Sequence, residues 1–291
     1  GEDHELRASA PLMRLALLVV LATSIPTAVS ARPAPDMYSC ITAARADPLH
    51  GGVVEAAESG TSASHGVDGP MTRTRQPIVT GGSVLGIKYR DGIMLAADTR
   101  ASYGSLARFP DMERIKRFGE KTIIGAGGDY SDFQQLSDMV DGMDQFDRNM
   151  NDGYFKTPRE IHSYLRAVMY NRRNRFNPLW NYLLVAGVDG QDKFLGIVDL
   201  IGTAYEENFI ATGFGSYLAI PIFRTRWHED MDEGEARGLL EDCMRLLYYR
   251  DARAGNKIQI AKATAEGTVV SPPYVLEGED WSSASFVERM A

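Results

Sequence analysis

The most restrictive feature of the sequence is a pair of short apolar runs with a tight turn between them. Residues 84–89 (VLGIKY) and 92–97 (GIMLAA) are separated only by Arg90-Asp91. Two strand-like runs joined by two polar residues predict a β-hairpin. The second run is apolar at every position, which is typical of a strand covered on both faces. The hairpin therefore needs a packed layer on each side.

The apolar patterns beyond this hairpin predict further strands and helices in an ordered series. We expect strands at residues 115–118, 122–126, 181–188, 194–199, 207–212, 257–263 and 268–271. Apolar residues at helical spacing predict helices around residues 133–143, 158–176, 216–228 and 234–253. We therefore predict an α+β protein with one folded domain, a four-layer α/β/β/α sandwich of two stacked antiparallel sheets.

The first 73 residues have a different character from the rest of the chain. Residues 15–25 (LALLVVLATSI) are apolar but shorter than the roughly 20 residues of a membrane helix, and they suit a signal-peptide core. Residues 32–69 are rich in Ala, Gly, Ser, Pro and Asp, which favours a disordered or removable segment. Three interpretations of residues 1–73 stay open: a removed propeptide or extension, an upstream artefact of the gene prediction, or a genuine targeting signal.

Charge and cysteine content argue against several classes of function. The net charge of −8 gives the chain no electrostatic attraction to nucleic acid or to an anionic membrane surface. Cys40 and Cys243 are its only cysteines, which is neither a disulfide framework nor a zinc pattern. The histidines do not have metal-ligand spacing. We therefore expect no metal ion and no organic cofactor, and a reducing compartment is the simpler interpretation.

Four segments of the chain resemble the β-type subunits of the proteasome, in the same order. They are TGGSVLG at 80–86, LAADTR at 95–100, GGDY at 127–130 and YYRDA at 248–252. A finer likeness to one particular β-type subunit comes from residues 69–74 (GPMTRT), 101–109 (ASYGSLARF), 177–181 (NPLWN) and 247–253 (LYYRDAR). The likeness covers residues 69–291 and implies the N-terminal-nucleophile hydrolase fold, which is a four-layer sandwich.

The resemblance also implies a catalytic site with which this sequence can be compared. Active members expose a threonine at the mature N-terminus, whose hydroxyl attacks the peptide carbonyl and whose own amine serves as the base. A lysine lowers the relevant pKa values, and an aspartate holds that lysine. The aspartate corresponds to Asp98, and the nucleophile, sixteen residues earlier, corresponds to Gly82. The lysine, sixteen residues later, corresponds to Arg114, which stays protonated and is bulkier.

A second aspartate and two serines complete the site of active members. The aspartate corresponds to Asp251, its nearby serine to Ala254, and the other serine to Phe214. Two carboxylates are thus retained, while the nucleophile, the lysine and the serines are replaced. The resemblance therefore implies a degenerate site in a subunit that is not itself an enzyme.

An active N-terminal-nucleophile peptidase is the alternative hypothesis, with Ser83 or Thr80 as the nucleophile. Ser83 would require cleavage after Gly82, and Thr80 would require cleavage after Val79. A shift of one residue along a strand turns a side chain to the opposite face, so Ser83 is expected to point away from Asp98. Thr80 lies two residues too far out.

Domain boundaries also follow from the resemblance. Residues 74–271 would form the proteasome β-type domain, after processing near Arg73 and Thr74. Such processing would leave a short arm before Gly82.

The last segment, residues 272–291, would form a C-terminal arm that reaches the opposite β ring. It carries Trp281 and Phe286, and exposed aromatic side chains on a tail are costly unless a partner covers them. We expect these two residues to anchor the contact between the rings.

The resemblance finally implies a place in the 20S core particle. A non-catalytic β subunit would contact other α and β subunits of the 20S proteasome, including neighbours in its ring and β subunits of the opposite ring. The whole complex would carry out ubiquitin-dependent protein degradation in the cytoplasm and nucleus, with no nucleic-acid or membrane partner. A secreted or organellar relative, directed by residues 15–31, is a further hypothesis.

Overall fold

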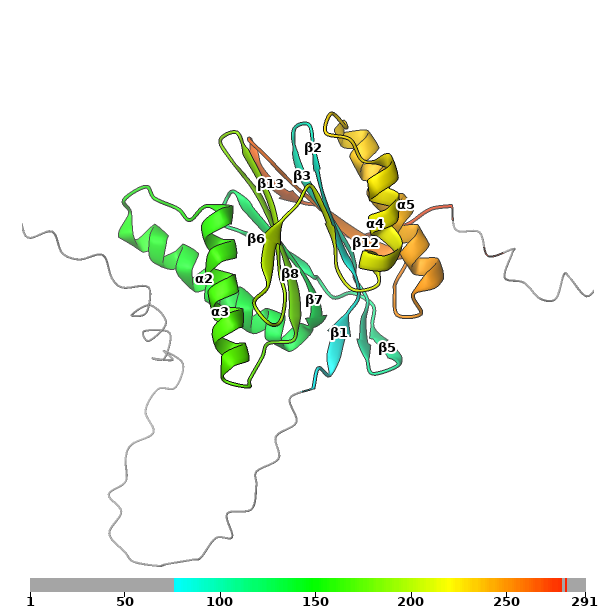
Figure 1. Ribbon diagram of the computed structural model, residues 1–291, viewed down its shortest axis with the longest axis horizontal. Helices are drawn as coiled ribbons and strands as arrows, with labels where there is room; N and C mark the ends of the chain where they lie inside the picture. Colours follow the sequence, from blue (N-terminus) through cyan, green and yellow to red (C-terminus); the bar gives the residue numbers. More distant parts are fainter. Residues whose placement is uncertain (1–75, 279–280, 282–291) are drawn as a thin grey trace, which may run out of the picture. The chain divides into compact units, whose positions relative to one another are not determined.

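Two antiparallel β-sheets pack face to face in the computed structural model, which describes residues 76–278 and residue 281 (Figure 1). The larger sheet has the strand order β10 (Ala204–Glu206), β9 (Asp192–Val198), β8 (Asn181–Asp189), β7 (Thr122–Asp129), β1 (Val79–Gly81), β4 (Ala101–Tyr103) and β5 (Leu106–Phe109), and β6 (Ile115–Phe118) also pairs with β7. The smaller sheet has the order β11 (Phe209–Ala211), β2 (Val84–Tyr89), β3 (Gly92–Asp98), β12 (Lys257–Thr264) and β13 (Gly267–Val270), and β14 (Tyr274–Val275) pairs with β12.

Each sheet carries a pair of helices on its outer face (Figure 1). The helices α2 (Tyr130–Met150) and α3 (Pro158–Asn174) cover the larger sheet, where Leu165 of α3 packs in one cluster with Leu183 of β8. The helices α4 (Gly215–Arg226) and α5 (Glu233–Arg250) cover the smaller sheet, where Leu239 of α5 packs with Leu85 of β2. These contacts confirm the predicted four-layer sandwich.

The space between the sheets is filled by aliphatic side chains from both of them. Ile93 and Leu95 of β3 pack there with Ile123 of β7 and Leu184 of β8. All seven residues of β3 are buried, as its unbroken apolar run predicts. The hairpin is also confirmed, because β2 pairs with β3 from Val84 opposite Ala97 to its turn at Arg90-Asp91.

Local signals explain where two of the helices begin. Thr157 caps α3 and Glu160 reaches back to the Thr157 backbone, which forms the capping box expected before Pro158. Asp232 and Glu235 form the same arrangement at the start of α5. Each box satisfies amide N–H groups that have no partner inside the helix.

Five short strands, namely β1, β4, β5, β10 and β14, were not predicted from the sequence. Most of them have exposed or half-buried side chains, so they lack an apolar pattern. The strand expected at 207–212 is also shorter, since β11 covers only Phe209–Ala211. Within the described residues, no helix has the length and apolar character needed to cross a membrane.

Candidate functional site

Gly82 lies where the chain passes from β1 in the larger sheet to β2 in the smaller one. A Cβ atom on Gly82 would lie 3.6 Å from Oδ1 of Asp98 and 3.9 Å from Oδ2 of Asp251. Both distances are ordinary van der Waals contacts, so a side chain would fit there. The structure thus brings Gly82 together with both aspartates of the predicted degenerate site, and the point that faces them carries no side chain.

Arg114 fills the centre of this site. Its guanidinium is 2% exposed and forms an ion pair with Asp98 Oδ1. Its N–H groups also donate to the carbonyl oxygens of Asp98 at 2.9 Å, Gly82 at 2.8 Å, Ser83 at 3.2 Å and Ala126 at 3.3 Å. The fork of donors on arginine suits such a cluster of acceptors. Arg114 therefore ties the β1–β2 junction to β3 and β7.

Asp98 sits at the end of β3 and is almost completely enclosed. Burial raises the pKa of its carboxyl, while Arg114 and the Gly255 amide act in the opposite direction. The Gly255 N–H donates to Asp98 Oδ2 at 2.8 Å. Both carboxylate oxygens of Asp98 therefore have partners within the fold.

Asp251 approaches the same point from the end of α5, where it is the C-cap residue. It is 7% exposed, and its Oδ1 accepts the Arg253 backbone N–H at 2.9 Å. Within residues 76–278 and 281, its other oxygen has no hydrogen-bond or ion-pair partner. Asp251 thus presents an oxygen without a partner to the space beside Gly82.

Ser83 points away from the two carboxylates. Its Oγ accepts the backbone N–H of Gly215 at 2.9 Å, and a Cβ on Gly213 would lie 3.3 Å from that oxygen. The side chain is therefore directed toward the loop before α4, as the alternation of side chains along a strand predicts.

Thr80 belongs to β1, which is paired on both sides. Thr80 lies opposite Ser102 of β4 and Asp129 of β7. The Asp129 carboxylate also accepts the Ile78 N–H at 2.8 Å. The segment leading into Gly82 is therefore built into the larger sheet, where it occupies the edges of β4 and β7.

The two residues predicted to stand in place of serines, Phe214 and Ala254, carry no hydroxyl group. Phe214, just before α4, is 58% exposed and caps no N–H with its side chain. Ala254 is buried, its N–H donates to the Asp251 carbonyl oxygen at 3.0 Å, and its own carbonyl accepts from Arg100 at 2.9 Å.

A cavity of about 210 Å³ opens beside these residues. Its wall includes five glycines, and also Asp251, Phe214, Tyr182 and Arg253. Glycine leaves backbone exposed and permits close approach of another chain or ligand. Tyr182 and Arg253 were not predicted from the sequence as part of the site, because Tyr182 is one residue of a strand pattern and Arg253 lies in the turn after α5.

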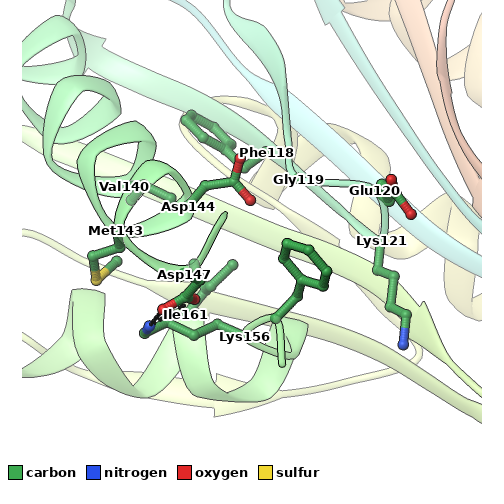
Figure 2. Close-up of a pocket in the computed structure, with 11 residues that line it drawn as sticks. Phe118, Gly119, Glu120, Lys121, Val140, Met143, Asp144, Asp147, Lys156 and Ile161 are labelled. Atoms are coloured by element: carbon green, nitrogen blue, oxygen red, sulfur yellow. Dashed lines mark hydrogen bonds and ion pairs between the residues drawn. The ribbon is translucent and has the colours of Figure 1, made fainter. Parts of the chain in front are cut away.

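A second, smaller hollow lies between α2, α3 and the β6–β7 turn (Figure 2). Lys156 donates to both carboxylate oxygens of Asp147 at 2.6 and 2.7 Å, and Asp144 is paired with Arg148. The hollow of about 40 Å³ has room for little more than a water molecule or two. Since both aspartates are neutralised, it is the weaker candidate for a site. In the described part of the chain, no three His, Cys, Asp or Glu side chains cluster in a way that could hold a metal ion.

The remaining predicted site residues lie at the ends of the chain. Trp281 is 46% exposed and packs edge-on against Tyr248 at 5.5 Å and Tyr249 at 5.0 Å between ring centroids. Phe286, Arg73 and Thr74 lie outside the described residues.

Comparison with known proteins gives consistent matches over the folded region. A family profile described as "Proteasome subunit" matches residues 78–263. Proteasome subunit beta type-4 of Arabidopsis thaliana is 48% identical over 214 residues, covering 74% of this chain and 87% of that protein. A probable proteasome subunit beta type-7 of Schizosaccharomyces pombe is 48% identical, covering 72% of this chain and 82% of that protein. Proteasome subunit beta type-4 of Xenopus laevis is 46% identical, covering 75% and 91%. The finer likeness in the sequence motifs is thus to proteasome subunit beta type-4.

Proposed function

This chain belongs to the proteasome subunit family, and from that premise we propose that it is a non-catalytic, structural β subunit of the 20S core. The observation that carries the proposal is the absence of a side chain at Gly82, where a Cβ atom would lie beside both Asp98 and Asp251. Peptide hydrolysis by this family's mechanism needs a hydroxyl and a free amine at that point. Cleavage before Gly82 would supply the amine but not the hydroxyl.

Arg114 stands where active members have a lysine, and a guanidinium is not deprotonated in proteins. Its contacts with Asp98 and four backbone carbonyls suit a structural connection between strands. The buried network around Arg114 therefore has a structural role, which is to stabilise the β1–β2 junction, and no catalytic one.

The strand edges beside Gly82 are not open to a substrate. An extended peptide binds a sheet by pairing with a free strand edge. Here β1 already pairs with β4 and β7 beside Gly82, so neither edge is free there. This arrangement also disfavours the alternative peptidase, because Thr80 lies within β1 and Ser83 faces Gly215.

The proposed role is assembly within the core particle. The chain would contact other α and β subunits, both in its own ring and in the opposite ring, and support ubiquitin-dependent degradation by the complex in the cytoplasm and nucleus. Large apolar side chains on its surface favour such burial, with Phe176 85% exposed and Tyr217 76% exposed. The segment from residue 272, with Trp281, is the proposed arm for inter-ring contact, and processing is proposed near Arg73.

Inhibitor labelling of the intact core particle tests this proposal. Particles containing the chain would be treated with a peptide epoxyketone or a β-lactone, and each subunit would be analysed by mass spectrometry. We expect adducts on the catalytic subunits of the same particle, which serve as the internal control, and none on this chain. An adduct on Ser83 or Thr80, together with a mature terminus at that residue, would establish the alternative function.

A further inference from the structure

The cavity beside Gly82 is lined by a carboxylate that lacks a positively charged partner in the described part of the chain. Asp251 is 7% exposed, and one of its oxygens has no partner among the residues that the structure describes. A cationic donor at this oxygen would form a charge-assisted hydrogen bond, which is stronger than one between neutral groups. The charge of Asp251 also acts on Asp98: burial is the main cause that raises the pKa of Asp98, and the charge of Asp251 raises it further.

The unpartnered oxygen is directed at open space. It lies 3.9 Å from the point where a Cβ on Gly82 would be, and that point borders the cavity of about 210 Å³. Asp98 faces the same point, but Arg114 and the Gly255 amide occupy its two oxygens. Asp251 is therefore the carboxylate available to a ligand.

The rest of the lining suits a small cation with N–H donors. Thr80 contributes a hydroxyl group, and the aromatic residues Tyr182 and Phe214 are 40% and 58% exposed. Aromatic faces attract cations, and hydroxyl oxygens accept hydrogen bonds from an ammonium group. Arg253 also lines the cavity, but its side chain is exposed and forms no ion pair with Asp251.

We propose that this cavity binds a primary ammonium group, from a peptide N-terminus or a lysine side chain, with Asp251 as its counter-charge. A divalent metal ion is a poorer fit, since it needs several oxygen ligands and only one carboxylate oxygen here is without a partner. The inference rests on the proposed function in one respect. Processing near Arg73 leaves Gly82 inside the chain, so the ammonium group in this space would come from another molecule or segment.

Photolabelling of intact core particles tests the inference. Three diazirine probes would be compared: photo-leucine amide with an α-ammonium group, Nα-acetyl-photo-lysine amide with an ε-ammonium group, and Nα-acetyl-photo-leucine amide with none. Peptide mapping would locate the label on this chain. We expect the label on residues 212–217 or 251–254. An ammonium probe should label these residues at least about tenfold more than the uncharged probe, because the uncharged probe cannot form the charge-assisted hydrogen bond to Asp251. The two ammonium probes distinguish a peptide terminus from a lysine.

Two controls make the result decisive. Asp251→Asn should lower the labelling about tenfold or more, whereas Asp91→Asn, which removes an exposed carboxylate from the β2–β3 turn, should leave it unchanged. If Asp251→Asn particles do not assemble, competition in natural particles decides: glycinamide should abolish the labelling and N-acetylglycinamide should not.

Equal labelling by the uncharged probe, labelling that survives in Asp251→Asn, or failure of glycinamide to compete would each overturn the inference. N-terminal sequencing of the same particles separates this outcome from a failure of the proposed function. A chain that starts at Ser83 or Thr80 contradicts the non-catalytic role, whatever the probes show.

Discussion

Replacing Arg114 with leucine removes the cation at the centre of the degenerate site. Arg114 and Asp98 are each 2% exposed, so the variant leaves the Asp98 carboxylate buried without its counter-charge. The carbonyl oxygens of Gly82 and Ser83 also lose their donor. Breaking a buried pair on one side costs about 3–5 kcal/mol of the free energy of unfolding. We expect Arg114→Leu to be destabilised by about that amount at neutral pH.

The loss should depend on pH in a defined direction. Burial already raises the pKa of Asp98, and removing Arg114, which opposes that effect, raises it further. An aspartate whose folded pKa is above its unfolded value binds more protons in the folded state. The free energy of unfolding therefore falls as pH rises through the range between these two pKa values. The deficit of Arg114→Leu should accordingly shrink as pH is lowered from 8 toward about 5, since Asp98 takes up a proton.

Urea unfolding of the purified full-length variants, followed by circular dichroism between pH 5 and 8, measures this effect. The double variant Arg114→Leu/Asp98→Asn is the matched control, because it removes the buried charge altogether. It should recover part of the lost stability at neutral pH and show no shrinking deficit on acidification. The electrostatic reasoning is wrong if the double variant is as unstable as the single variant, or if the single variant's deficit is the same at both ends of the range.

Three further predictions concern steric fit, helix capping and thiol reactivity. Gly81→Ala should destabilise the chain by about 1–3 kcal/mol in urea unfolding, because its Cβ would clash with Cδ of the buried Arg114 side chain. Gly82→Ala has room for its Cβ and should cost less than about 1 kcal/mol, and equal effects of the two substitutions would contradict this difference. Thr157→Ala removes the cap of α3 and should cost about 1 kcal/mol in the same assay, and an unchanged midpoint would argue against the capping box. Burial raises the pKa of Cys243 to about 12, so iodoacetamide at pH 8 should alkylate this thiol in urea and not in the folded chain; peptide mapping would distinguish it from Cys40, and alkylation of Cys243 in the folded chain would contradict the prediction.

Much of the fold could be predicted from the sequence because its strong signals are local. Two apolar runs with Arg90-Asp91 between them predict the β2–β3 hairpin, and Thr157 and Glu160 predict the start of α3. A hairpin of fixed length also keeps the spacing between its two ends constant. For that reason, the sixteen-residue spacing of the family that the sequence resembles could be carried over from Asp98 to Gly82 without any coordinates.

Features that depend on contacts between distant segments were not predictable in the same way. The strand β1 has only three residues, and it is a strand because β4 and β7 supply its hydrogen-bond partners. The side chains of such a strand carry little periodicity, because the pairing is made by the backbone. The pairing of β1 with β4 and β7 beside Gly82 was therefore not predicted from the sequence.

The sequence by itself determined which chemical groups this chain has: a glycine at position 82, an arginine at position 114, and aspartates at positions 98 and 251. Only the tertiary structure decided how these groups are paired, since Arg114, Asp98 and Asp251 come from separate parts of the chain. It gave Asp98 two partners and left one oxygen of Asp251 with none in the described residues. Residue identity fixes the available charges, whereas burial and donor placement, which depend on the whole fold, decide whether each charge is compensated.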